Sequence, residues 1–169
     1  MNSKLAAGDA AAFDELYREM ADRLFHYLLM QTGSREDSAD LIQESFVRLY
    51  QMRKNLASVE NISAYVFKVT RNELMRWRSK NQRKVSSSCE LFDVPIVSDS
   101  STLDAHERVV KALLQIEDRY REVIELKTFA NLTFAEISVA IGKPQGTIAT
   151  WYRRGLAQLK DGLNNLSDG

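Results

Sequence analysis

The 169-residue sequence predicts an all-α protein, built from two small helical domains joined by a flexible acidic linker. Apolar residues recur at steps of three and four through most of the chain, which is the spacing of one face of a helix. Only 7 Gly and 2 Pro are present, too few for a turn-rich all-β fold. Residues 86–107 contain five acidic residues, many serines and no Lys or Arg, which is typical of a linker between modules.

The first predicted domain, residues 1–84, is a bundle of three helices. An apolar stripe predicts a helix over residues 10–31, which Gly33 ends. Ser34 followed by Asp37 is typical of a helix start, and the period continues in a second, antiparallel helix to residue 53. Residues 55–61 lack this pattern and predict a loop, and a third helix follows from residue 62 into a basic segment. The first stripe consists of Phe13, Leu16, Tyr17, Met20, Leu24, Tyr27 and Leu28.

The second predicted domain, residues 104–169, follows a linker over residues 85–103 and contains shorter helices. Helical spacing covers residues 103–114 and 119–129, and Asn131 can adopt the left-handed conformation that closes a helix. Thr133 and Glu136 fit a capping box, in which each side chain accepts a hydrogen bond from the other residue's backbone N–H. Gly142 then interrupts the pattern before a last helix over residues 147–163. Its inward residues are predicted to be Ile148, Leu156, Leu159 and Leu163.

Charge is distributed unevenly, although 23 Lys and Arg balance 23 Asp and Glu. Residues 1–85 carry 14 basic and 11 acidic residues, a net of +3, so residues 86–169 carry 9 and 12, a net of −3. Residues 68–84 hold seven basic residues against Glu73 alone. Such a segment attracts phosphates, and Trp77 within it can stack on unpaired bases. The alternative is a solvated helix face with Trp77 in the core.

A short capped helix, a turn at Gly142 and a longer helix form the pattern of a helix-turn-helix. The second helix of this motif enters the DNA major groove by its N-terminal residues. Arginine can pair with guanine, glutamine with adenine, and threonine with a thymine methyl group or a phosphate. The candidate DNA-contacting residues are Gln145, Thr147, Thr150, Trp151, Arg153 and Arg154. The alternative is a plain helical hairpin with solvated arginines.

The sequence contains no constellation typical of catalysis or metal binding. His26 and His106 lie in different modules, Cys89 is the single cysteine, and there is no phosphate-binding glycine loop. We therefore predict no enzyme activity, no catalytic residue, no cofactor and no metal site. No window approaches the roughly 18 apolar residues of a membrane span, and the N-terminus lacks the apolar core of a signal peptide. These features predict a cytoplasmic protein with no membrane insertion of its own.

Several segments carry a family resemblance. The first module contains AFDELY at 12–17, DSADLIQESFVRLY at 37–50 and AYVFKVTRN at 64–72. The second contains RYREVI at 119–124, LTFAEI at 132–137 and a last segment at 146–159. In order and spacing they resemble regions 2 and 4 of bacterial extracytoplasmic-function (ECF) sigma factors of the sigma-70 family. The chain departs from the family pattern at Tyr65, Arg76, Ala149 and Trp151, where a tryptophan, an acidic residue and two basic residues are usual.

The resemblance implies a subunit that binds core RNA polymerase, recognises the −35 and −10 promoter elements and assists melting. Its partners would be the β′ clamp helices and β flap of polymerase, promoter DNA, and the anti-sigma factor that the family often has. The implied polymerase-binding residues are Asp40, Gln43, Glu44, Phe46 and Arg48, with a core position as the alternative for Phe46. The implied −10 residues are Asn55, Asn61, Lys68, Arg71, Asn72, Arg76, Trp77 and Arg78.

Within this assignment, the loop over residues 55–61 would capture a base flipped from the non-template strand, because a base can be read on its pairing edge only once it is unstacked. The helix from Thr147 would read the −35 element, and the acidic linker would thread the polymerase interior. The main rival is a stand-alone helix-turn-helix regulator that binds duplex DNA as a dimer. A helical interaction module without DNA contact would leave the basic segment unexplained.

Overall fold

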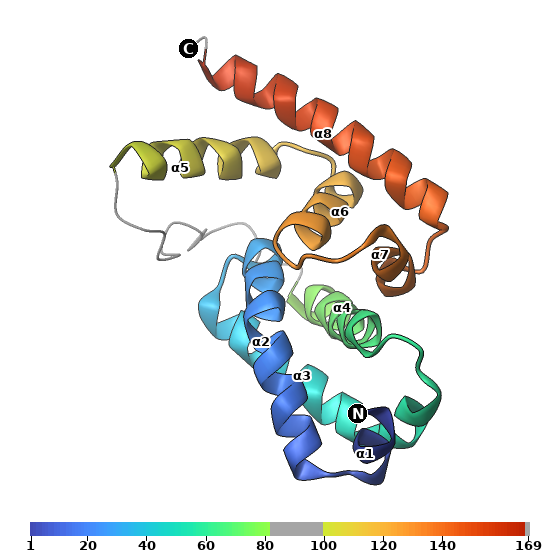
Figure 1. Ribbon diagram of the computed structural model, residues 1–169. Helices are drawn as coiled ribbons and strands as arrows, with labels where there is room; N and C mark the ends of the chain where they lie inside the picture. Colours follow the sequence, from blue (N-terminus) through green and yellow to red (C-terminus); the bar gives the residue numbers. More distant parts are fainter. Residues whose placement is uncertain (82–99, 168–169) are drawn as a thin grey trace.

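The computed structural model describes residues 1–81 and 100–167, and within these ranges it contains helices and no strand (Figure 1). The first domain consists of α1 (Asn2–Ala7), α2 (Ala10–Thr32), α3 (Arg35–Gln51), a 3₁₀ helix η1 (Arg53–Ser58) and α4 (Ile62–Asn81). The second consists of α5 (Ser100–Leu114), α6 (Asp118–Thr128), α7 (Phe134–Ile141) and α8 (Gln145–Ser167). No helix in the described parts of the chain is long and apolar enough to cross a membrane.

Local sequence signals explain the start and end of the long helices. The carboxylate of Asp9 accepts a hydrogen bond from the backbone N–H of Ala12 at the start of α2, and Gly33 ends that helix with a φ of 68°. The hydroxyl of Ser34 accepts from the N–H of Asp37 at the start of α3. The three helices predicted for this domain are therefore confirmed to within a few residues.

Two short elements of the first domain were not predicted. Residues 53–58 lie in the 3₁₀ helix η1 where the sequence predicted irregular loop from residue 55, and α1 has only six residues. Each is held by one fully buried leucine, Leu5 in α1 and Leu56 in η1. A periodic pattern cannot show over so few residues, so these elements depend on tertiary packing for their stability.

The second domain confirms the capping box of Thr133 and Glu136 and the turn at Gly142, whose φ is 77°. Asn131 has a φ of 52°, as expected for a residue that closes a helix. The inward face of α8 differs from the prediction, because Leu156 is 40% exposed and Gly155 is buried in its place. Position 155 lies seven residues after Ile148, two helical turns along the same face, whereas position 156 lies about a quarter turn away.

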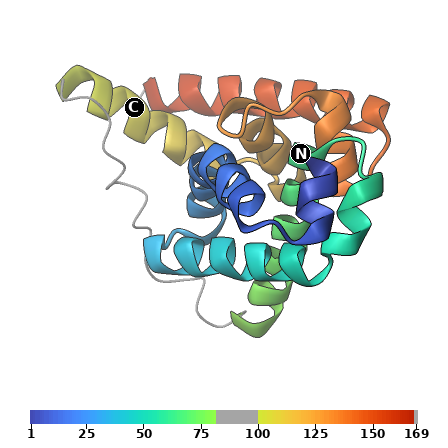
Figure 2. The same cartoon turned by 60° about the horizontal axis from the view of Figure 1, so that its bottom comes forward.

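Helix α5 begins at Ser100, before the predicted linker end at residue 103. The remainder of that predicted linker, with Arg83 and Lys84 of the basic segment, falls outside the described residues. Nothing in the sequence placed the two domains relative to each other. In the structure α7 lies beside α4, and α2 lies between α3 and the second domain (Figure 2).

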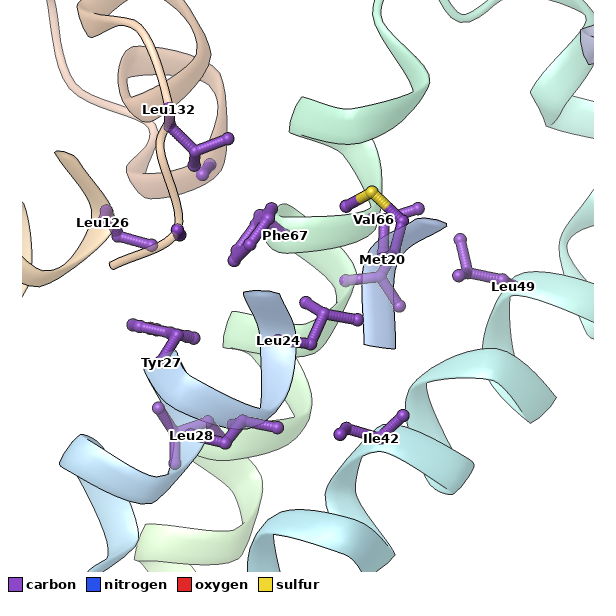
Figure 3. Close-up of a cluster of buried hydrophobic side chains, with 14 of the residues drawn as sticks. Met20, Leu24, Tyr27, Leu28, Ile42, Leu49, Val66, Phe67, Leu126 and Leu132 are labelled. Atoms are coloured by element: carbon purple, nitrogen blue, oxygen red, sulfur yellow. The ribbon is translucent and has the colours of Figure 1, made fainter. Parts of the chain in front are cut away.

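A continuous apolar core joins the two domains. Phe67 of α4 is fully buried, and Leu126 of α6 and Leu132 of the loop before α7 belong to the same cluster (Figure 3). Tyr27 of α2 packs edge-on against Phe67, with ring centroids 5.9 Å apart. The second domain therefore covers one face of α2 and α4, and this contact decides which candidate residues reach solvent.

Candidate nucleic-acid and protein interfaces

A surface groove between α3 and α4 brings together two of the predicted residue sets. This groove has a volume of about 560 Å³. It is lined by Asp40, Gln43, Glu44, Val47, Arg48, Gln51, Glu73, Arg76, Trp77 and Lys80. Asp40, Gln43 and Glu44 are exposed, so one wall offers acidic and amide groups while the other offers basic groups and a half-buried tryptophan. We call it the α3–α4 groove.

Two arginines of this groove are tied to one buried carboxylate. Glu73 is 7% exposed and accepts a hydrogen bond from Nε of Arg48 at 3.2 Å and another from a terminal nitrogen of Arg76. Arg48 was predicted to face polymerase and Arg76 to hold DNA. Their guanidinium groups are partly exposed, so each has a fixed internal partner and also a solvent-facing side. Glu73 was not among the predicted site residues.

An apolar hollow beside this groove contains Phe46, whose burial is intermediate. The ring of Phe46 meets the edge of Tyr17, with centroids 5.0 Å apart, and Tyr50 meets Phe13 in the same way. Tyr17 is 41% exposed, which corrects its predicted inward position, because it lies at the margin of the α2 stripe. Val47 and Tyr50 are also exposed, and periodicity did not select them as interface residues.

The residues predicted to hold −10 DNA divide between two faces of α4. Lys68, Asn72 and Arg76 recur at steps of four and are exposed. Arg71 and Arg78 lie on the other face, toward the second domain and α2. The structure therefore does not bring the predicted −10 residues into one surface.

Arg71 forms a bidentate ion pair with Glu122 of α6. Nε of Arg71 lies 2.8 Å from one carboxylate oxygen of Glu122 and Nη2 lies 3.1 Å from the other. The hydroxyl of Tyr27 also donates to Glu122, at 2.8 Å. Burial and the charge of Glu122 raise the pKa of Tyr27 well above its ordinary value, so this hydroxyl remains a donor at neutral pH. Burial acts to lower the pKa of Arg71, but its hydrogen bonds to Glu122 and the charge of that carboxylate outweigh burial and raise the pKa.

A second polar contact lies beside this ion pair. The side-chain nitrogen of Gln31 donates to Glu125, which is fully buried. The side-chain oxygen of Gln31 accepts from Arg78. Burial raises the pKa of Glu125 to about 8, although Arg121, Gln31 and Arg78 oppose the shift. Among the described residues, Oε1 of Glu125 and Nε of Arg121 lie 3.6 Å apart without a hydrogen-bond partner.

Asn61 lies at a pocket of about 550 Å³ beside the N-terminus of α4. Its side-chain oxygen accepts from the N–H of Ala64, and its amide donates to Glu136 of α7 at 3.0 Å. Partial burial acts to raise the pKa of Glu136, but hydrogen bonds from Thr133 and Asn61 lower it overall. Asn55 is exposed in η1 and does not line this pocket. The two asparagines of the predicted base-capture loop are therefore separated.

The first half of α8 faces solvent over part of its surface. Gln145, Arg153 and Arg154 are exposed, while Thr147 and Thr150 are half-buried and the Thr150 hydroxyl donates to the carbonyl of Gly146. Trp151 packs against Tyr120 with ring centroids 6.4 Å apart. The structure thus leaves three of the six predicted DNA-contacting residues exposed and turns the Trp151 ring toward α6.

The sequence did not identify the polar residues between the domains. Arg23, Tyr27 and Gln31 recur at steps of four on α2, and Arg23 donates to the carbonyl of Ala130 at 2.7 Å. Glu122 and Glu125 stand three residues apart among apolar residues of α6. Two acidic residues within an apolar stripe could have indicated a buried polar contact. The stripe does not show which helix covers it, so it could not have identified the partners.

Two family models match the chain in order. A model of sigma-70 region 2 matches residues 16–84, and one of sigma-70 region 4 matches residues 106–159. The chain is 27% identical over 168 residues to ECF RNA polymerase sigma factor SigE of Mycolicibacterium smegmatis, covering 94% of this chain and 65% of that protein. It is 28% identical over 151 residues to ECF RNA polymerase sigma factor SigL of Mycobacterium tuberculosis, covering 86% and 85%.

The fold also matches a solved structure, that of CnrH in complex with the cytosolic domain of CnrY. The TM-score is 0.72 at 18% sequence identity, with 97% of this chain and 95% of that chain covered. At this identity the likeness concerns the fold, and it extends over both domains.

Proposed function

The chain belongs to the ECF sigma factors of the sigma-70 family, and from this premise we propose that it binds core RNA polymerase and directs promoter-specific transcription initiation. The observation that carries the proposal is the presence of region 2 and region 4 matches, in that order, on two separate helical domains. The bond-forming chemistry of transcription belongs to the polymerase. The helix-turn-helix regulator does not account for a region 2 match, so we do not favour it.

Residues 1–84 are the proposed polymerase-binding and −10 domain, and residues 104–169 the proposed −35 domain, with the intervening segment as linker. The α3 side of the α3–α4 groove supports polymerase binding, because Asp40, Gln43 and Glu44 are exposed together beside the apolar hollow of Phe46. A mixed surface of this kind suits a protein partner with basic and apolar side chains. Because the proposed partner is core RNA polymerase, we propose that the protein acts in the cytoplasm.

Promoter contact is assigned to two helices. In α8, Gln145 is exposed at the start of the second helix of the helix-turn-helix, where the motif meets base edges and phosphates. Arg153 and Arg154 are exposed about two turns farther along the same helix. In α4, Lys68 and Asn72 are exposed, and Arg76 has a solvent-facing side. The −10 assignment also includes Asn61 at its pocket, Arg71 and Arg78 on the covered face, Trp77 at the α3–α4 groove and exposed Asn55.

Run-off transcription from a promoter library with purified core polymerase tests the proposal. We expect transcripts from a defined subset of promoters that core polymerase alone does not produce. The double variant Glu44→Ala with Gln43→Ala should lose most of this signal, because both side chains lie on the proposed polymerase surface. Glu15→Ala is the matched control, since Glu15 is exposed on α2 and does not line the groove. Transcripts no higher than those of core polymerase alone would contradict the assignment.

A further inference from the structure

The buried carboxylate of Glu73 joins the two walls of the α3–α4 groove through one oxygen atom. Oε1 of Glu73 accepts a hydrogen bond from Nε of Arg48 on α3 at 3.2 Å, and another from Nη1 of Arg76, about one turn farther along α4. The side chains of Arg48 and Arg76 are 43% and 56% exposed. Two half-exposed arginines with different proposed partners therefore share a single internal acceptor.

The two arginines compete for this oxygen. Each guanidinium is positively charged at all physiological pH values, so their repulsion opposes simultaneous binding to one carboxylate. The pair that either arginine forms with Glu73 strengthens when the other arginine leaves, because Oε1 then accepts one charge-assisted hydrogen bond without a competing donor. Movement of Arg76 toward an outside phosphate thus fixes Arg48 more firmly, and firmer pairing of Arg48 releases Arg76.

The two walls of the groove benefit from opposite halves of this exchange. Arg76 lies with Lys68 and Asn72 on the exposed face of α4, where a DNA phosphate can draw its guanidinium outward. Arg48 lies on the α3 wall among acidic and amide groups, with its Nη1 3.4 Å from Oε1 of Gln51. A protein partner on that wall meets a guanidinium whose direction is already set, which reduces the entropy lost on binding.

We propose that Glu73 is a positioning residue that couples the polymerase-binding wall to the DNA-binding wall, by giving up Arg76 and pairing fully with Arg48 when either partner binds. The coupling rests on the proposed function, because it takes the α3 wall as the polymerase surface and Arg76 as a promoter contact. Coupling between two binding sites is reciprocal. Through this carboxylate, core polymerase therefore raises the affinity for DNA, and DNA raises the affinity for polymerase by the same factor.

Binding of the full chain to immobilised core polymerase tests the exchange. Arg76→Ala leaves Oε1 of Glu73 to Arg48 alone, and we expect it to tighten binding roughly two- to fivefold, the range of a partly exposed ion pair. Arg18→Ala is the matched control, since it removes the same charge from an exposed arginine of α2 that pairs with Asp14. A purely structural role for Arg76 would weaken binding or leave it unchanged. An affinity of Arg76→Ala equal to or below that of the control would overturn the proposal.

The same substitution in a Glu73→Gln background separates the exchange from a simple effect of charge. Glu73→Gln keeps the shape of the side chain and removes its charge, so neither arginine is held by a carboxylate. The gain from Arg76→Ala should disappear in this background, because no ion pair is left to strengthen. A gain that persists would exclude Glu73 as the link between the two arginines. If Glu73→Gln does not fold, the single variants still decide the question.

The reciprocal effect is measured with a fluorescein-labelled random single-stranded DNA, by anisotropy at fixed salt. A random probe suffices because phosphate contacts are independent of sequence. Arg48→Ala leaves Glu73 to Arg76 alone, so it should weaken DNA binding by the full chain roughly two- to fivefold more than Arg18→Ala, which removes the same charge. Equal affinities of these two variants would show that Arg48 does not influence Arg76, and would overturn the proposal.

Failure of the coupling and failure of the proposed function give different results. A wild-type chain that binds core polymerase and supports promoter-specific transcription, while Arg76→Ala binds polymerase no more tightly than Arg18→Ala, is a sigma factor without this exchange. A wild-type chain that does not bind core polymerase contradicts the proposed function itself, whatever the DNA measurements give.

Discussion

The two helices assigned to promoter DNA differ in how they are held. Helix α8 packs on α5, α6 and α7 of its own domain and leaves Gln145, Arg153 and Arg154 exposed. Helix α4 is enclosed on two sides, with Arg76 bound to Glu73 within its own domain and Arg71 bound to Glu122 of the other. One proposed promoter surface is exposed in the fold as it stands, while part of the other is covered by the second domain.

The difference follows from the place of each helix in the fold. α8 is the outer element of its domain and needs only one apolar face, supplied by Ile148, Gly155 and Leu159. α4 contacts α2 and α3 in its own domain and α7 in the other, so the polar residues on its covered faces find partners inside the protein. On α4, Arg71, Arg76 and Arg78 are therefore paired within the protein while Lys68 is exposed. On α8, Arg153 is exposed and Arg154 donates to the hydroxyl of Tyr120 at 3.5 Å.

The largest expected effect is on promoter binding by the exposed surface of α8. Arg153→Ala should weaken binding of the polymerase–protein complex to promoter duplex by about 1–3 kcal/mol, or roughly 5- to 150-fold, if it contacts a base. Arg154→Ala should weaken it in the same direction. Neither change should affect binding to core polymerase. Lys160→Ala, an exposed change farther along α8, is the control and should alter the affinity little. Footprints unchanged in both arginine variants would remove α8 from the promoter assignment.

A smaller effect is expected on the pH dependence of the contact between the two domains, which covers one face of α4. Glu125 has a pKa of about 8 in the closed arrangement, in which the two domains are packed together, against an ordinary value of 4.5 that we take for an open arrangement with the domains apart. Between these values only the closed state holds the extra proton, so its stability declines as pH rises through this window and levels off above about pH 8. One proton corresponds to at most about 1.4 kcal/mol, or tenfold in the closed-to-open equilibrium, per pH unit.

Energy transfer between dyes on Glu15→Cys in the first domain and Lys160→Cys in the second, with Cys89→Ser, checks this dependence when it is measured from about pH 6.5 to 7.5. Glu125→Gln should flatten the curve, because the amide does not titrate. The lowered pKa of Glu136 acts in the opposite direction and only near or below its ordinary value of 4.5, so it does not contribute here. The raised pKa of Tyr27 keeps that group protonated throughout. A Glu125→Gln protein with the same slope as the wild type would assign the dependence to another group.

The smallest expected effect is on the free energy of unfolding and tests the packing of α8 against α6. A Cβ at Gly155 would lie 2.8 Å from Cδ1 of Ile124 and 3.1 Å from Cβ of Tyr120. Overpacking should exceed the gain in helix preference, so Gly155→Ala should lower the free energy of unfolding by about 1 kcal/mol. At Gly162 the nearest atom would be 3.5 Å away, and Gly162→Ala should be neutral or stabilising by up to about 1 kcal/mol. Urea unfolding of both variants measures this, and equal values would show that α6 and α8 can move apart freely.

Much of the fold could be predicted because its signals are local. The capping box at Thr133 and the stops at Gly33 and Gly142 involve residues within a few positions of one another. Exposure at the edge of a stripe was less predictable, as Tyr17 and Leu156 show, since a small rotation of a helix moves an edge residue from core to solvent. Residue types identified the candidate sites, but not their partners.

The interior contacts of the candidate site could not be predicted from periodicity. Arg71 and Glu122 are 51 residues apart, and Glu73 joins residues of α3 and α4. A stripe shows that a helix has a covered face, while the identity of the covering element is a property of the tertiary fold. The family resemblance supplied the order of the regions and the residue roles, but not the domain contact.

The order in which the chain is made gives the domain contact a further consequence. The first domain is synthesised before α6 exists, and the contacts that later cover it span 51 residues for Arg71 with Glu122 and 107 residues for Arg23 with Ala130. Contacts this distant form after local helices and individual domains. A nascent chain therefore displays Phe67 and the arginines around it on the ribosome, and a truncated product ending after α4 would keep them displayed.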